Sequence, residues 1–182
     1  LTITDGQAAE GGGIRNEGTL SIADSIISDN KATSFGGGIS NVGTLAITGS
    51  TISDNWANNS GGGIDNDGSG QGDDGSVTIT NTTISGNTSS YGGGITTYQA
   101  GPATLINVTV LDNSASNTGG GVYNFETTVE LANTIVADNA APNSPDSYGG
   151  FDSLGYNLIG NPSASTGWTS SDLLNLDPRL GP

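Results

Sequence analysis

A recurring glycine triplet is the feature that most constrains what this chain can fold into. Each triplet is followed by Ile or Val, and the triplets begin 25, 25, 31 and 27 residues apart, at 11–13, 36–38, 61–63, 92–94 and 119–121. An asparagine ends a Ser-Asp-Asn-like segment in each unit, and its spacing varies together with that of the triplets, at Asn30, Asn55, Asn87, Asn113 and Asn139. Two markers that drift together define one structural unit, and a period of roughly 20–50 residues indicates a solenoid or a similar array.

Aliphatic residues alternate with small and polar residues between these markers. Counted back from each asparagine, the third position is Ile27, Ile52, Ile84, Val110 and Val136, and the eighth is Ile22, Ile47, Ile79, Leu105 and Leu131. Apolar residues at i and i+2 in short runs predict half-buried β-strands, about three in each unit. Stacked units bury each aliphatic column in a continuous core.

The sequence therefore predicts an all-β fold, namely a right-handed, single-stranded parallel β-helix of about six rungs. Residues 1–155 are expected to form the β-helix repeats, with an incomplete first rung in which Leu1 and Ile3 align with Leu20 and Ile22. Residues 156–182 break the pattern and are expected to form a C-terminal cap.

The composition excludes several classes of function. Three basic and 18 acidic residues give a net charge of −15, which disfavours nucleic acid as a partner and disfavours anionic membrane surfaces. The chain contains no Cys and no His, so it lacks thiol chemistry and the commonest general base. It also contains no Met and no signal peptide or membrane-spanning run, so we expect a processed chain or a fragment of a secreted protein, without membrane insertion.

An acidic insertion at 65–75 separates two of the units. Its Asp-x-Asp-Gly-Ser-Gly pattern is similar to the start of an EF-hand calcium loop, although a Ser stands where the last ligand of such a loop is Glu. The predicted calcium ligands are Asp65, Asp67, Ser69 and Asp73, and a solvated acidic loop without a metal is the alternative.

No catalytic constellation stands out. Adjacent units offer Asp29 and Asp54 as a carboxylate pair, but an aspartate repeated at one position of the unit is more simply explained by turn formation. We therefore predict no catalytic residues, and a polysaccharide lyase or hydrolase is the enzymatic alternative. Aromatic residues gather near successive triplets and are expected to form a buried ladder or an exposed strip for sugar rings: Tyr91, Tyr98, Tyr123, Phe125 and Tyr148.

The segment from Gly36 to Asn55, which contains Gly-Gly-Gly-Ile, Thr-Leu-Ala-Ile and Thr-Ile-Ser-Asp-Asn, resembles the β-helix repeats of bacterial surface proteins. It resembles those of choice-of-anchor Q domain proteins and, more distantly, those of polymorphic outer-membrane proteins. This resemblance implies an extracellular or cell-surface location and a non-catalytic structural or adhesive role. We expect either a stalk or a subunit that stacks end to end into a filament, because open strand edges can pair with another copy. A carbohydrate-binding module that engages a glycan or another cell-surface partner is the alternative.

Overall fold

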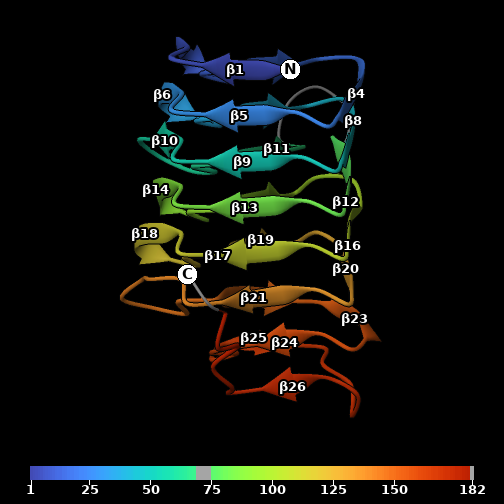
Figure 1. Cartoon of the computed structure of the whole chain (residues 1–182). Coiled ribbons are helices and arrows are strands. Elements are labelled where there is room, and N and C mark those ends of the chain that lie inside the picture. Colours follow the sequence, from blue (N-terminus) through green and yellow to red (C-terminus); the bar gives the residue numbers. More distant parts are fainter. Residues whose placement is uncertain (69–74, 181–182) are drawn as a thin grey trace.

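The computed structural model describes residues 1–68 and 75–180, and in these residues the chain is a parallel β-solenoid. Four sheets run along the axis, and every strand pairing in them is parallel. Figure 1 shows the successive rungs stacked in chain order from the N-terminus downward. The predicted parallel stacking of about six turns is confirmed.

Each sheet collects the equivalent strand of successive rungs. Sheet A contains β1 (Thr2–Thr4), β5 (Ile26–Ser28), β9 (Thr51–Ser53), β13 (Thr83–Ser85), β17 (Thr109–Leu111), β21 (Ile135–Ala137), β24 (Leu158–Ile159) and β26 (Leu173–Leu174). Sheet B contains β2 (Gln7–Glu10), β6 (Lys31–Phe35), β10 (Trp56–Ala57), β14 (Thr88–Tyr91) and β18 (Ser114–Thr118).

Sheets C and D complete each rung. Sheet C contains β3 (Ile14–Asn16), β7 (Ile39–Asn41), β11 (Ile64–Asp67), β15 (Ile95–Tyr98), β19 (Val122–Phe125), β22 (Ser147–Gly150) and β25 (Ser165–Thr166). Sheet D contains β4 (Thr19–Ala23), β8 (Thr44–Thr48), β12 (Ser76–Thr80), β16 (Ala103–Ile106), β20 (Val129–Ala132) and β23 (Asp152–Gly155).

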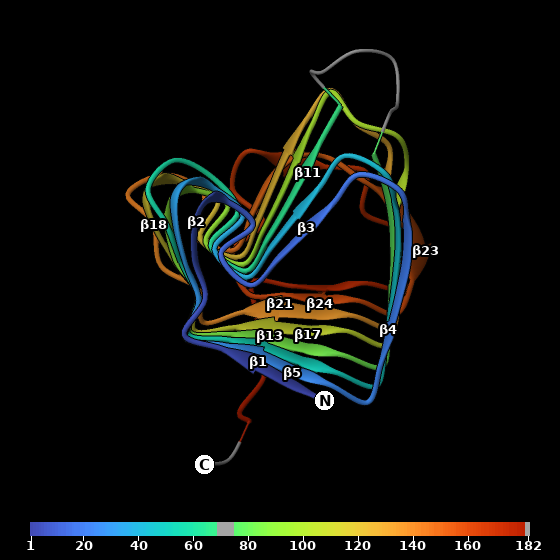
Figure 2. The ribbon, with the colours of Figure 1, turned by 90° about the horizontal axis from the view of Figure 1, so that it is seen from above.

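Sheets A, C and D surround the hydrophobic core, as the view down the axis in Figure 2 shows. The predicted aliphatic columns lie in register there: Ile27 pairs with Ile52, and Ile47 pairs with Ile79. All four side chains are fully buried. The alternation of aliphatic and polar residues therefore correctly identifies the inward face of each strand.

Sheet B consists of one strand from each of the first five rungs, which the sequence pattern did not reveal, so a full rung has four strands instead of about three. It forms a lobe beside sheet C (Figure 2). Its buried positions are small residues, such as Ala32, Ala57 and Ala115, and carry no aliphatic signal. Because the lobe is narrow, alanine is enough to fill it.

The alignment of the first rung was also wrong. Ile3 pairs with Ile27, and Gln7 pairs with Lys31, so β1 belongs to sheet A and not beside Leu20 in sheet D. At the other end, β24 and β26 extend sheet A and β25 extends sheet C, so the strands between Leu158 and Leu174 continue the parallel stacking.

The repeated asparagines form a continuous hydrogen-bonded ladder in the turn between sheets A and B. In each step from Asn30 to Asn139, both the backbone N–H and the side-chain Nδ2 donate to Oδ1 of the next asparagine, at 2.9–3.0 Å. The ladder ends at Asp146, whose Oδ1 accepts both bonds from Asn139. All of these asparagines are buried, and the ladder satisfies their polar groups inside the turn.

The glycine triplets form the corner between sheets B and C. The first glycine of each of the five triplets has a positive φ of 59–68°, which a residue with a Cβ rarely adopts. At the second glycine the limit is space: a Cβ on Gly62 would lie 2.4 Å from the carbonyl oxygen of Gly93 in the next rung. This corner brings the end of a sheet B strand against the outer face of sheet C, and it positions the candidate site.

Candidate functional site

A pocket of about 540 Å³ opens between the sheet B lobe and the outer face of sheet C. Its sheet B side is lined by Phe35, Asn59, Ser60, Ser90, Tyr91 and Asn117. Its sheet C side is lined by Asp65, Asp67, Thr96, Tyr98 and Tyr123. Each side contains residues from several successive rungs, so stacking assembles the pocket from segments that are distant in the sequence.

The strand register explains why these side chains share one face. Asp65 pairs with Thr96 and Thr96 with Tyr123, while Asp67 pairs with Tyr98 and Tyr98 with Phe125. The inward-facing Asn66, Thr97 and Asn124 alternate with them and are buried. Side chains at i and i+2 of a strand point to the same side, so the two columns run in parallel along the outer face of sheet C.

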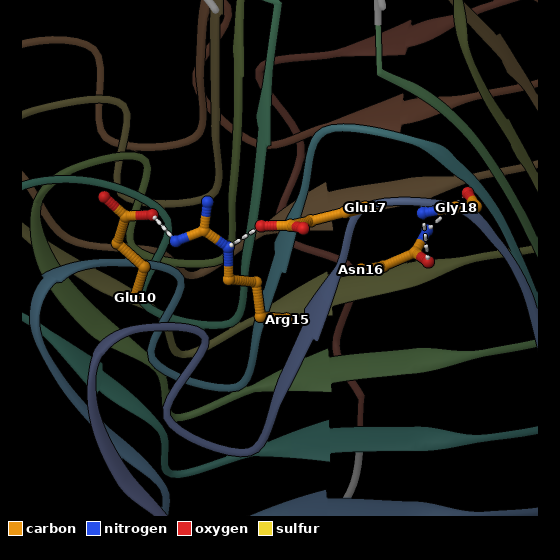
Figure 3. A network of polar contacts seen from close by, with 5 residues as sticks. All are labelled: Glu10, Arg15, Asn16, Glu17 and Gly18. Carbon is orange, nitrogen blue, oxygen red and sulfur yellow. Dashed lines mark hydrogen bonds and ion pairs between the residues drawn. The ribbon is translucent and has the colours of Figure 1, made fainter.

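Side chains across the glycine corner link the two walls of the pocket. The residue before a triplet meets the residue five positions later: Ser60 Oγ donates to Asp65 Oδ1 at 2.6 Å, and Thr96 Oγ1 donates to the Tyr91 carbonyl at 2.9 Å. In the first rung the same two positions hold Glu10 and Arg15, which form an ion pair (Figure 3). These two positions therefore meet across the corner in three of the rungs, with different chemistry in each of the three.

Aromatic rings stack along the groove in two columns. Tyr123 stacks on Tyr148 with ring centroids 5.0 Å apart and planes 5° apart, and Tyr98 stacks on Phe125 at 5.1 Å and 10°. Tyr91 tilts against Tyr123, with 5.4 Å between centroids. Tyr91 and Tyr98 nevertheless remain 40% and 38% exposed, so the aromatic residues form both a ladder and an exposed strip.

Asp65 lies at the base of the pocket and is only 2% exposed. Loss of solvation raises the pKa of Asp65 from 3.8 to about 7, the hydrogen bond from Ser60 opposes this rise, and the charges of Asp67 and Glu10 add to it. Burial is the dominant cause because a carboxylate loses most of its hydration there. Burial likewise raises the pKa of Tyr123, with smaller contributions from neighbouring tyrosines.

No lysine or arginine lines the pocket among the described residues. Arg15 lies in the same outward column as Asp65, through Ser40, but its guanidinium contacts Glu10 and Glu17 (Figure 3). Lys31 lies over the Trp56 ring on sheet B, 4.6 Å from its centroid. The described lining of the pocket is therefore acidic, aromatic and hydroxyl- or amide-bearing.

Two of the predicted calcium ligands, Asp65 and Asp67, lie in β11 and line this pocket. The other two, Ser69 and Asp73, lie outside the described residues, so calcium binding stays a prediction. Within residues 1–68 and 75–180, no group of three or more acidic side chains is arranged to hold a metal ion.

The sequence pattern identified the aromatic residues of the pocket except Phe35, and it missed the polar residues opposite them. Asn59, Ser60 and Ser90 belong to ends of sheet B strands or the loops beside them, which carry no distinctive residue type. The one available signal was their place just before a triplet.

The structure also contains, in the part it describes, no helix long and apolar enough to cross a bilayer.

Comparison with known families gives one match. Residues 24–42 match the Chlamydia polymorphic membrane protein repeat. Comparisons with curated proteins and with solved structures gave no match, and the resemblance to choice-of-anchor Q domain proteins stays an expectation. The matched segment runs from the turn after β4 to the residue after β7, so it covers three of the four strands of one rung, β5, β6 and β7. This chain is thus a parallel β-solenoid with part of one unit similar to a repeat of those membrane proteins, which suggests a surface protein.

Proposed function

We propose that this chain is a non-catalytic, adhesive element of a bacterial surface protein, and that it binds an extended carbohydrate along the groove between sheets B and C. The observation that carries the proposal is the exposed aromatic strip beside polar side chains in a pocket of about 540 Å³. The exposed parts of the Tyr91 and Tyr98 rings supply apolar contact for sugar rings, and a few polar groups fix the orientation of the sugar.

The direction of the groove supports an extended ligand. The two aromatic columns follow the solenoid axis, because their members occupy equivalent positions in successive strands of sheet C. The two rings within each column are 5.0–5.1 Å apart, so the same ring spacing occurs in both columns. A polysaccharide repeats in the same way along its own axis, and multiple weak contacts in register would add up.

The burial of Asp65 supports a role without catalysis. A general acid must reach the scissile bond within hydrogen-bonding distance. Asp65 has the raised pKa that such a group needs, but it is covered and hydrogen-bonded to Ser60. We therefore assign it to the structure of the pocket and expect no glycan cleavage.

The test is a glycan-array screen followed by affinity measurements on the best glycan, comparing the wild-type protein with a Tyr98→Ala variant. We expect Tyr98→Ala to weaken binding at least about tenfold, because loss of an aromatic anchor costs about 1.5 kcal/mol or more. Tyr156→Ala is the matched control, because Tyr156 is 75% exposed and does not line the pocket. Equal loss in both variants, or binding by neither protein, would contradict the proposal.

End-to-end stacking into a filament is a separate proposal about how the element is displayed. It would continue the parallel backbone pairing of the sheets from one copy to the next. Negative-stain electron microscopy at increasing protein concentration tests it. Long fibres would support stacking, and short rods at every concentration would leave a monomeric stalk.

A further inference from the structure

We propose that the pocket between sheets B and C selects a ligand group that carries a positive charge, such as the ammonium group of an amino sugar. This inference deepens the proposed function by naming the charge class of the ligand, and it rests on that function only for the carbohydrate part. It follows from where the aromatic stacks end and from which charges meet them.

The aromatic column of Tyr98 ends at an acidic rung. Phe125 covers one face of the Tyr98 ring, at 5.1 Å between centroids. The opposite face is directed toward the preceding rung, where the registered residue is Asp67. A cation that reaches this face from the pocket therefore meets a π-system with a carboxylate on the neighbouring strand.

In the second column a threonine separates the aromatic rings from the acidic residue. Tyr148 covers one face of Tyr123, and the strands on its other side carry Thr96 and then Asp65 at the same position. Tyr91 approaches Tyr123 from sheet B, and Phe35 lines the pocket from the same side. Four aromatic side chains and the carboxylate of Asp67 thus line one space from two walls, whereas Asp65 is buried and its raised pKa leaves it partly neutral near pH 7.

Both kinds of side chain favour a cation. The face of an aromatic ring is its negative side and attracts an ammonium group within about 6 Å of the centroid, more strongly with a carboxylate nearby. No basic side chain among the described residues lines the pocket to neutralise it, and the chain carries 18 acidic and three basic residues. The same charges would repel the carboxylates of a uronic-acid polymer.

Choline and its neutral isostere 3,3-dimethylbutan-1-ol form the sharpest pair of probes, because they have the same shape and differ in one charge. Titration of each into the full chain, followed by calorimetry or by the tyrosine resonances in NMR, measures the preference directly. We expect choline to bind at least about tenfold more tightly than the alcohol, and the difference to shrink as salt is added.

Two variants locate the effect. Asp67→Asn keeps the shape of the side chain and should remove most of the preference for choline, whereas Tyr98→Ala should weaken both probes. Tyr156→Ala should change neither. Thermal unfolding of each variant verifies that it is folded before binding is compared.

The outcomes separate this inference from the proposed function. Equal affinity for choline and the alcohol, or binding of neither probe by a protein that retains a neutral glycan, would overturn the charge preference and leave the carbohydrate groove in place. A choline preference that persists in Asp67→Asn would also overturn this inference, because a group other than Asp67 would then recognise the positive charge. Choline selectivity in a protein that retains no glycan would support the cation site and contradict the proposed function.

Discussion

At the scale of single residues, the buried carboxyl of Asp65 makes the stability of the fold depend on pH. Its pKa is 3.8 as a free group and about 7 in the folded chain. The folded state therefore holds a proton on Asp65 that the unfolded state has already released between these values. A group with a raised carboxyl pKa stabilises the fold below its unfolded pKa, and this contribution is lost as the pH rises through the folded pKa.

We expect an Asp65→Asn variant to lack this loss, because an amide cannot ionise and its oxygen can still accept the hydrogen bond of Ser60. Relative to the variant, the wild-type protein should lose on the order of 4 kcal/mol of unfolding free energy as the pH rises from about 4 to about 7. Urea denaturation of both proteins across that range measures the difference. Parallel curves for the two proteins would contradict the assigned pKa, and comparison within the pair cancels other groups, such as Asp146 with a raised pKa and Asp172 with a lowered one.

The residue at the end of the asparagine ladder is a carboxylate for a physical reason. Each asparagine of the ladder donates its hydrogen bonds to the equivalent residue of the next rung, so the last residue needs only to accept hydrogen bonds. Asp146 Oδ1 accepts two bonds from Asn139, and its Oδ2 accepts the backbone N–H of Asn161 at 2.7 Å. A second column ends similarly at Asp172, whose Oδ1 accepts from the backbone N–H and the side chain of Asn157.

An Asp146→Asn variant should therefore be destabilised although the two side chains have the same shape. One end of the amide is a donor and would face either Asn139 or Asn161, which are donors themselves. We expect a loss of about 1–3 kcal/mol in chemical denaturation at neutral pH. Asp177→Asn is the control and should change stability by less than about 0.5 kcal/mol, because Asp177 is exposed and accepts only the backbone N–H of Arg179 among the hydrogen bonds described. An unchanged Asp146→Asn variant would contradict the acceptor role.

At the scale of the strand and its turns, the glycine corner sets how closely rungs approach. At Gly62 an added Cβ would lie 2.4 Å from the Gly93 carbonyl oxygen and 2.6 Å from the Thr88 amide nitrogen. The atoms in these contacts belong to the backbone, and hydrogen bonds to the rungs on both sides hold them in place. The corner can accept a methyl group only if two rungs separate.

Two glycine substitutions test this corner. Gly62→Ala should cost about 3 kcal/mol of unfolding free energy, because backbone atoms cannot move aside. Gly18→Ala, in a turn where an added Cβ meets nothing within 4 Å, should be neutral or stabilising by up to about 1 kcal/mol. Differential scanning calorimetry of both variants measures the contrast, and similar midpoints would show that rung spacing does not limit the corner.

At the scale of the whole molecule, the net charge of −15 acts against compaction. Equivalent acidic residues occupy the positive-φ position before the asparagine ladder: Asp29 and Asp54 lie one rung apart, Asp112 and Asp138 lie one rung apart, and Gly86 separates the two pairs. Like charges repeated in this way repel, and mobile ions screen the repulsion over about 10 Å at moderate ionic strength.

Added sodium chloride should therefore raise the thermal midpoint of the chain as repulsion is screened. Asp54→Asn should reduce the size of this effect by removing one charge of the Asp29–Asp54 pair, whereas Thr51→Ser, which leaves the charge unchanged, should not. Thermal unfolding at low and high salt measures both slopes. A midpoint that falls with added salt would show that attractive pairs, such as Arg15 with Glu10 and Glu17, outweigh the repulsion.

Calcium would act on the same scale by binding the folded chain. A site saturated at about one hundred times its dissociation constant stabilises the fold by about 2.7 kcal/mol. We expect the midpoint to rise in calcium relative to chelator, and Asp73→Asn to reduce that rise, because Asp73 is one of the predicted ligands. An equal response to magnesium would indicate general screening of charge and would contradict a specific calcium loop.

The repeat itself was readable from the sequence because its signals are local. The glycine triplets, the closing asparagines and the period-two aliphatic columns each lie within one unit, and side-chain alternation converts them directly into inward and outward faces. The parallel stacking, the core residues and the asparagine ladder follow from them. The sequence pattern did not predict sheet B, because alanine and serine fill its interior and these residues do not distinguish the inward face of a strand from the outward face.

The pocket depends on what lies beside each residue in the next rung. Asp65 and Tyr123 are 58 positions apart in the chain, and the register of β11, β15 and β19 places them in one column. Composition alone cannot show that Asp65 is buried against Ser60, nor that the aromatic strip stacks and yet stays partly exposed. The sequence by itself determined the repeat and its buried columns, since these require only local periodicity. The tertiary structure decided the lobe, the pocket and the ionisation of Asp65, because those arise from contacts between rungs.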